Sequence, residues 1–222
     1  MKTTNKKPIM TYLFLALNIL VFLYMLVVYG TTTDARVLLL MGAKFNYLIL
    51  VQGEWWRLIT AAFIHIGLSH ILFNGISLYF MGLELEPLLG SFKFSLVYLL
   101  AGLGGNLASF AFNPANISAG ASTSIFGLFA SFVALAYIYP QSTWIRQRAR
   151  NFIMLIALNI INGLLIPDID NWGHIGGAIF GFLVTVVLLR PQQATRKTHK
   201  SLAFLLLVGL SMLFLYLGYQ SI

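Results

Sequence analysis

Long apolar stretches separated by short polar segments dominate this sequence. Six stretches contain no Asp, Glu, Lys or Arg, and each has the roughly 17 or more residues that a helix needs to cross the hydrocarbon core of a bilayer. They are residues 8–33, 58–83, 94–145, 151–167, 171–189 and 201–222. The third is long enough for two crossings, and the turn-forming run Asn113-Pro114-Ala115-Asn116 interrupts it near its middle. The pattern therefore predicts seven membrane helices.

The predicted fold is an all-α, polytopic membrane helical bundle that forms a single domain over residues 1–222. The expected helices are residues 8–29, 60–83, 94–112, 120–140, 150–167, 171–189 and 201–220. Residues 34–57 are apolar but interrupted, and Trp55 and Trp56 near their end suit headgroup depth. We predict an interfacial loop there, and a peripheral helix is equally compatible with the pattern.

Composition agrees with a protein that lies in lipid. Of the 222 residues, 59% are hydrophobic and 9% are charged, far from the usual balance of soluble domains. The absence of cysteine excludes disulfide scaffolds, thiolate nucleophiles and Cys-ligated metals. The net charge of +8 could indicate nucleic acid, but the basic residues lie between apolar stretches. We therefore expect the lipid bilayer, and no nucleic acid, as a partner.

The distribution of basic residues predicts the orientation in the membrane. With a cytoplasmic N-terminus, eleven basic residues lie inside: Lys2, Lys6, Lys7, Lys93, Arg146, Arg148, Arg150, Arg190, Arg196, Lys197 and Lys200. Only Arg36, Lys44 and Arg57 then lie outside. This bias predicts a multi-pass protein of the cell membrane with an extracytoplasmic C-terminus. His199 lies in an inside basic cluster, where we expect it to be solvated.

Several polar residues fall at one depth in this orientation. The helices expected from residues 60, 120 and 171 all run from outside to inside, and near their starts lie His65, His70, Asn74, Ser122 and His174. At about 100° per residue, His70 and Asn74 share one helix face, whereas His65 is about 140° from His70. Ionisable groups inside a membrane tend to face a cavity or a partner, so three histidines at one level suggest a site.

Packing alone explains part of this pattern. Serine and threonine in membrane helices commonly hydrogen-bond a neighbouring helix or their own backbone. Gly177 and Gly181 have the spacing of two small residues on one helix face, which is first of all a close-packing device. That spacing would bring the helix of residues 171–189 against the helix of residues 120–140.

The polar inventory excludes several membrane functions. An aspartyl intramembrane protease needs two carboxylates within the spans and a zinc protease needs His-Glu-x-x-His, and the sequence has neither. The last apolar stretch, Ser201–Ile222, has no lysine for a retinal Schiff base. The intramembrane carboxylates usual in ion-coupled transport are also missing. A hydroxyl nucleophile with a neutral imidazole base remains.

Ser122 and His174 are the candidates for this chemistry. Ser122 would attack a peptide carbonyl after His174 removes its proton, and His174 would then protonate the leaving amine. The Ser122 N–H, His70 and Asn74 would stabilise the oxyanion. No acidic residue lies within the spans to orient His174, so we expect a dyad. Phe126, on the Ser122 face of its helix, either stacks on His174 or only packs between helices.

Four motifs in this order resemble the rhomboid family of intramembrane serine proteases. They are Trp56-Arg57, His70-x-x-x-Asn74, Gly120-x-Ser122, and His174 followed by Gly177-x-x-x-Gly181. The resemblance implies a six-helix core of the bacterial type with a seventh helix at the C-terminus. It also implies cleavage of membrane proteins in or near their transmembrane segments, without a cofactor or a metal.

The resemblance also implies a role for each matched residue. Ser122 is the expected nucleophile, His174 the base, and His70 and Asn74 the oxyanion donors, with structural support from Gly120, Phe126, Gly177, Gly181, Trp56 and Arg57. One departure is Thr123, which stands where family members commonly have glycine. Ser124 lies about 200° around the helix from Ser122, so we expect it to pack away from His174.

Two alternatives stay open. A rhomboid-like protein without catalysis would bind membrane clients, although such relatives usually lack the serine or the histidine. A small transporter or channel would carry polar residues in both halves of the membrane, whereas here they gather towards the outer half.

Overall fold

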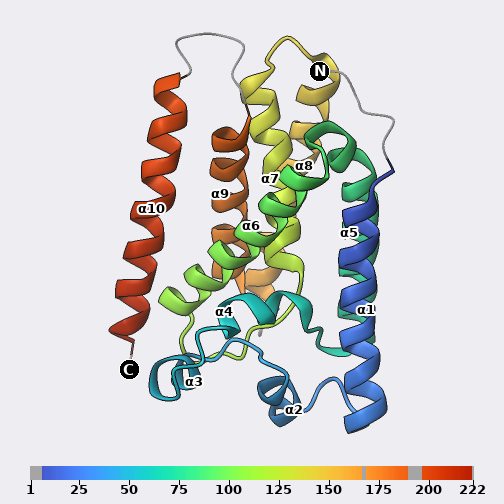
Figure 1. The fold of residues 1–222 in the computed structure, drawn as a ribbon, viewed down its shortest axis with the longest axis vertical. Helices are drawn as coiled ribbons and strands as arrows, with labels where there is room; N and C mark the ends of the chain where they lie inside the picture. Colours follow the sequence, from blue (N-terminus) through green and yellow to red (C-terminus); the bar gives the residue numbers. More distant parts are fainter. Residues whose placement is uncertain (1–6, 167–168, 190–196, 222) are drawn as a thin grey trace.

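The computed structural model describes residues 7–166, 169–189 and 197–221 (Figure 1). Its long helices are α1 (Ile9–Tyr29), α5 (Gly67–Leu89), α6 (Ser91–Phe112), α7 (Ser122–Ile138), α8 (Thr143–Leu165), α9 (Asn171–Leu188) and α10 (Lys197–Tyr219). Among the described residues, six have the length and composition to cross a membrane, and α7 is a shorter apolar helix of 17 residues. The prediction of an all-α, polytopic membrane bundle is confirmed. Some residues used in the predictions lie outside the described residues. They are residue 167, the last of the fifth expected helix, and four of the basic residues that predicted the orientation, Lys2, Lys6, Arg190 and Arg196.

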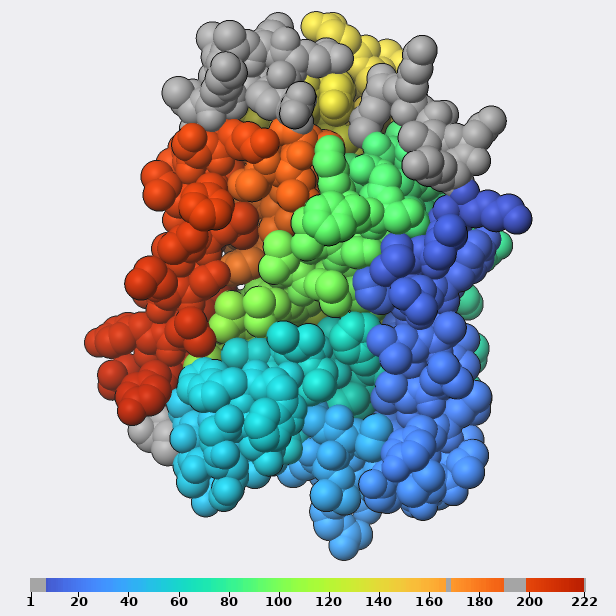
Figure 2. Space-filling view, in the orientation of Figure 1, coloured from blue at the N-terminus to red at the C-terminus, as the bar shows by residue number. Residues whose placement is uncertain are grey.

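The long helices run along one another, with α1 and α10 on opposite flanks (Figure 1). The start of α1 lies at the end of the bundle where α8 begins, and α10 finishes at the opposite end. The connection between α1 and α5 covers this second end, as the space-filling view shows (Figure 2). The bundle therefore has two distinct ends, and the ordered connection covers only one of them.

The connection between α1 and α5 contains short helices where the sequence predicted an interfacial loop. They are α2 (Ala35–Leu40), α3 (Asn46–Val51), α4 (Arg57–Thr60) and the 3-10 turn η1 (Ala61–Phe63). Asp34 caps α2 by accepting a hydrogen bond from the Arg36 N–H at 2.8 Å. Gly42 and Gly53, with φ of 97° and 72°, provide the left-handed turns that follow α2 and α3. The apolar runs in this segment are thus long enough for single helical turns but too short to cross the bilayer.

Helix α5 extends beyond its charge-free stretch because its two glutamates have partners. Glu84 forms an ion pair with Arg148 of α8 at 2.9 Å. Glu86 is buried and accepts hydrogen bonds from the Thr11 N–H at 2.8 Å and the Thr11 hydroxyl at 2.7 Å. Glu86 therefore ties α5 to the first turn of α1, whose free N–H groups favour a negative charge.

Helix α8 begins earlier than the sequence predicted. The Ser142 side chain accepts a hydrogen bond from the Ile145 N–H at 3.3 Å, so the helix begins at Thr143. It therefore includes the three arginines that the charge pattern assigned to an inside segment, Arg146, Arg148 and Arg150. Arginine favours helices and its long side chain reaches the interface, so charges do not mark where a membrane helix ends. His199 is exposed, as expected, and its Nδ1 also lies at hydrogen-bond distance from the Tyr137 hydroxyl, which joins α10 to α7.

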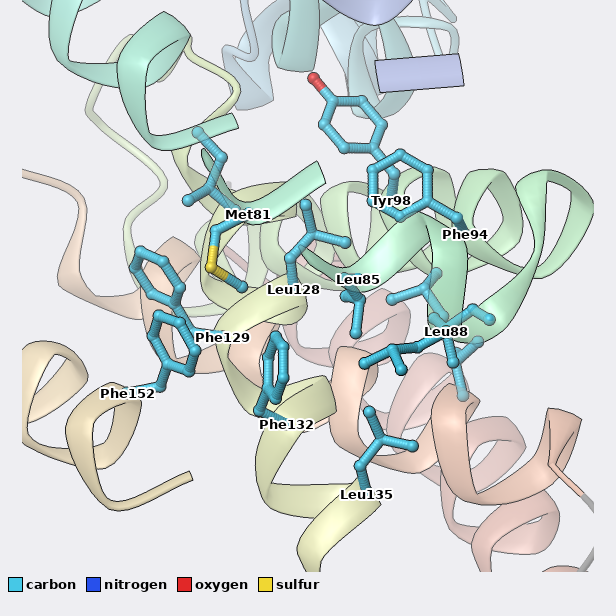
Figure 3. Packing of buried hydrophobic residues seen from close by; sticks show 14 of the residues in the cluster. Met81, Leu85, Leu88, Phe94, Tyr98, Leu128, Phe129, Phe132, Leu135 and Phe152 are labelled. Atoms are coloured by element: carbon cyan, nitrogen blue, oxygen red, sulfur yellow. The ribbon is translucent and has the colours of Figure 1, made fainter. Parts of the chain in front are cut away.

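A buried apolar cluster fills the space between α5, α6 and α7 (Figure 3). It includes Met81, Leu85 and Leu88 of α5, Phe94 and Tyr98 of α6, Leu128, Phe129, Phe132 and Leu135 of α7, and Phe152 of α8. On the other side of α7, glycines bring α9 into direct backbone contact. A Cβ on Gly177 would overlap the Thr123 carbonyl, and a Cβ on Gly181 would overlap Gly127. This close approach brings the N-terminal turns of α7 and α9 side by side.

Candidate active site

Ser122 and His174 meet across the contact between α7 and α9. Ser122 is the first residue of α7, and His174 lies in the first turn of α9, which begins at Asn171. The Ser122 Oγ lies 3.0 Å from the His174 Nε2, at hydrogen-bond distance. At this distance a neutral imidazole can accept the hydroxyl proton while the oxygen attacks a carbonyl carbon.

The ring of Phe126 lies flat against the ring of His174. Their centroids are 4.1 Å apart and their planes differ by 6°. Phe126 follows Ser122 by one helical turn, so the helix that carries the hydroxyl also restricts the imidazole. The His174 Nδ1 is buried and has no hydrogen-bond partner among the described residues. The stacked ring of Phe126 therefore orients this histidine. In the described parts of the chain, no carboxylate forms a hydrogen bond with its Nδ1.

His70 and Asn74 bring two further polar groups to a cavity that the Ser122 hydroxyl lines. The Ile66 N–H lies 3.4 Å from the His70 Nδ1, so the neutral ring carries its proton on Nε2. A Cβ on Gly120 would lie 2.8 Å from this Nε2 and 3.6 Å from the Ser122 Oγ. Glycine therefore leaves the space between His70 and Ser122 empty.

The amide of Asn74 and the start of α7 add hydrogen-bond donors. The Asn74 Nδ2 is buried and has no acceptor among the residues that the structure describes. The first N–H groups of α7, beginning with that of Ser122, have no acceptor within the helix. Together with the His70 Nε2–H, these donors can bind a negative charge that develops beside the Ser122 hydroxyl.

The site opens into a cavity of about 560 Å³. The walls come from α5, α7, α8 and α9, and from residues 117–120 that precede α7. Six of the predicted site residues line it: His70, Asn74, Gly120, Ser122, Phe126 and His174. The volume falls in the range of small-molecule sites.

Trp56 and Arg57 lie in the first connection and do not line this cavity. Arg57 is buried, donates to the carbonyls of Leu39 and Ala43 at 2.7 and 2.8 Å, and forms an ion pair with Glu54. Trp56, in contrast, is 54% exposed. Arg57 thus holds the connection together, whereas Trp56 is available to the membrane interface.

His65 is not where the sequence predicted it. The helical expectation put it inside a helix from residue 60, turned away from His70, but α5 begins only at Gly67, whose φ is 77°. The His65 and His70 rings are 5.3 Å apart. The Ala121 N–H lies 3.3 Å from the His65 Nε2, at hydrogen-bond distance. His65 therefore supports Ala121, the residue before Ser122. Because α5 begins only at Gly67, the angle of about 140° expected between His65 and His70 on one helix does not apply.

Asp170, which the sequence analysis missed, also lines the cavity. It caps α9 by accepting a hydrogen bond from the Gly173 N–H at 3.0 Å, and its other oxygen accepts from the Ser118 hydroxyl at 2.6 Å. Asp170 directly precedes the apolar stretch of residues 171–189, so it does not count among acidic residues within the membrane spans. An aspartate immediately before a predicted helix is a capping signal that could have found it.

Thr123 and Ser124 face neighbouring helices. The Thr123 side chain lies against Gly105 of α6 and Gly173 of α9, where added Cβ atoms would approach it at 2.6 and 3.2 Å. Glycines therefore make room for a β-branched residue beside Ser122. Ser124 is fully buried against Gly102 of α6, away from His174 as its helical position predicted.

The bundle and the site define a class: a multi-pass membrane protein with a serine and a histidine in contact at a cavity between its helices. Comparison with known proteins gives the family. Residues 52–191 match the family model described as the Rhomboid domain, which is more than half of the chain. The chain therefore belongs to the rhomboid family.

Individual relatives extend this similarity over nearly the whole chain. "Rhomboid protease GluP" of Bacillus subtilis (strain 168) is 42% identical over 217 residues, which cover 98% of this chain and 42% of that protein. "RHOMBOID-like protein 1" of Arabidopsis thaliana is 38% identical over 155 residues, 68% of this chain and 39% of that protein. "Rhomboid protease AarA" of Providencia stuartii is 31% identical over 206 residues, 81% of this chain and 72% of that protein. This chain thus spans less than half the length of the first two relatives.

Proposed function

We propose that this protein is an intramembrane serine endopeptidase that hydrolyses peptide bonds in or near the transmembrane segments of other membrane proteins. The observation that carries the proposal is the 3.0 Å contact between the Ser122 Oγ and the His174 Nε2 at a cavity of the bundle. Two of the relatives named above are called rhomboid proteases, which supports the same activity. No cofactor is needed for this chemistry.

The reaction follows from the contacts of the two residues. His174 takes the proton of the Ser122 hydroxyl while the oxygen attacks the carbonyl carbon of the substrate. The imidazolium then gives this proton to the leaving amine, and a water molecule activated by the same ring releases the acyl group from Ser122. The stacked ring of Phe126 keeps His174 aimed at the serine through both steps.

The oxyanion of the tetrahedral intermediate binds to donors for which the described residues provide no acceptor. These are the His70 Nε2–H, the Asn74 amide and the Ser122 backbone N–H. Preorganised donors of this kind stabilise the charge that develops in the transition state. Thr123 leaves them free, because its side chain packs between glycines of α6 and α9.

We also propose that the protein lies in the membrane with its N-terminus in the cytoplasm and that it forms one membrane domain. The charge pattern favours a cytoplasmic N-terminus and an extracytoplasmic C-terminus. The site would then lie towards the outer side of the cell membrane, since α7 and α9 begin there. Helix α10 packs on α6 and α9, and α1 packs on α5, which supports a single domain.

Cleavage of a single-span reporter protein in detergent tests the activity. We expect the purified protein to cut the reporter, and Ser122→Ala and His174→Ala each to lower the rate by about 10⁴-fold or more, because the two residues act as a unit. Ser142→Ala is the matched control, since it removes a serine hydroxyl at the start of another helix, α8, and should leave the rate unchanged. Variants that cut like the wild type would refute the site. Reporter binding without any cleavage would favour the client-binding alternative.

A further inference from the structure

Ser118 and Asp170 form a hydrogen bond that links the two sides of the site. The Ser118 hydroxyl donates to the Asp170 Oδ2 at 2.6 Å. Ser118 precedes Ser122 by four residues, and Asp170 precedes His174 by four residues. One short hydrogen bond thus joins the segment that leads into the nucleophile to the residue that begins the helix of the base.

The segment around Ser118 needs such an attachment, because it is not helical. Its backbone pairs with Lys44 through two hydrogen bonds, Lys44 N–H to Ser118 carbonyl at 2.9 Å and Ser118 N–H to Lys44 carbonyl at 3.0 Å. The Gly120 N–H donates to the Ala61 carbonyl at 2.9 Å. These contacts fix the segment to the first connection and to η1, but none of them reaches α9.

Asp170 provides the connection to α9 with an oxygen that the helix cap does not use. The cap uses Oδ1, which accepts from the Gly173 N–H at 3.0 Å and also lies 3.3 Å from the Asn113 Nδ2. The remaining oxygen accepts from Ser118, which is buried. A residue that only capped the helix would need one acceptor oxygen, so the second contact points to a further role.

We propose that Asp170 and Ser118 are positioning residues that set the distance between Ser122 and His174. The proposal rests on the proposed protease function and deepens it. The glycine contacts keep α7 packed on α9, but among the described residues no other hydrogen bond joins residues 117–120 to Asp170 or α9. Loss of this hydrogen bond therefore lets the segment that carries Ser122 shift against the first turn of α9. A shift of about 1 Å between reacting groups costs on the order of 10²-fold in rate, so the hydrogen bond contributes to catalysis by positioning the two residues.

Ser118→Ala is the sharpest test, because it removes the bridge and leaves the α9 cap intact. We expect kcat for reporter cleavage to fall by about tenfold to 10²-fold with KM unchanged. Ser118→Thr keeps the hydroxyl in an extended segment that tolerates a β-branched residue, and should restore kcat. Asp170→Asn, which keeps an acceptor for the cap and a partner for Ser118, should act more mildly than Asp170→Ala.

Ser142→Ala serves as the control, and thermal unfolding in detergent is measured for every variant. A Ser118→Ala protein with wild-type kcat would overturn the positioning role and leave the proposed function standing. So would a loss of kcat that Ser118→Thr does not restore, or one that follows the loss of thermal stability across the variants. A wild-type protein that cuts no reporter would overturn the proposed function, and with it this role.

Discussion

Replacing Gly120 with alanine should block the space between His70 and Ser122. The new Cβ would lie 2.6 Å from the His70 Cε1 and 2.8 Å from its Nε2, closer than folded proteins allow, so the imidazole would have to turn away. Loss of one oxyanion donor costs about 10²- to 10³-fold in kcat, or about 2.7–4 kcal/mol of transition-state stabilisation. We expect Gly120→Ala to lose kcat by about this factor with little change in KM, because the donor acts only in the transition state.

Backbone strain is the competing explanation, since Gly120 has φ of 138°. Gly90 provides a matched control. It has φ of 79° and nothing within 4 Å of an added Cβ, and it lies between α5 and α6. Gly90 has ψ of 151°, a backbone conformation that is nearly restricted to glycine, so Gly90→Ala adds strain of about 1–3 kcal/mol without contact with the site.

Both alanine variants are compared by reporter cleavage and thermal unfolding in the same detergent. We expect both to lose stability and only Gly120→Ala to lose kcat. Equal kcat values for the two variants would refute the oxyanion geometry, because the added methyl group would then leave the reaction space free.

Two further predictions concern Phe126 and Lys44. Phe126→Leu keeps an apolar side chain and loses the ring contact with His174, worth about 0.5–1.5 kcal/mol; steady-state cleavage should show kcat reduced roughly two- to tenfold, and a change confined to KM would contradict this role. Lys44 is buried and donates to the Ser109, Asn113 and Asn116 carbonyls, and burial lowers its pKa from the ordinary 10.5 to about 8. At pH values between these two pKa values, Lys44 is protonated in the unfolded chain and neutral in the folded protein, so the free energy of unfolding rises with pH. The unfolding midpoint is measured at about pH 7 and at about pH 10. We expect it to rise more between these pH values in the wild type than in Lys44→Met, and equal rises in the two proteins would contradict this role of Lys44.

The helices could be predicted from the sequence because a bilayer demands long apolar segments. Their ends could not, because charged residues at the ends are paired or reach the interface. Glu86 lies inside α5 since Thr11, 75 residues earlier, supplies its hydrogen bonds. Hydrogen-bond partners this distant in the chain depend on how the helices pack, and the pattern of residues along the sequence does not predict them.

The contact between Ser122 and His174 could be anticipated because both residues stand at the start of helices that run in the same direction. His65 shows the limit of that reasoning. Its position depends on the extended backbone before Gly67, which no helical periodicity describes. Asp170 stands just before an apolar span, and its hydrogen bond with Ser118 of a non-helical segment does not follow from the pattern of residues.

Covalent labelling of the nucleophile tests the central claim most directly. The wild-type protein in detergent is treated with a fluorophosphonate, which reacts with activated serine hydroxyls, and the modified residue is identified by mass spectrometry. We predict modification at Ser122, and its loss in His174→Ala, because the 3.0 Å contact with His174 activates that hydroxyl. Modification of another serine, or unchanged labelling of Ser122 in His174→Ala, would contradict the account.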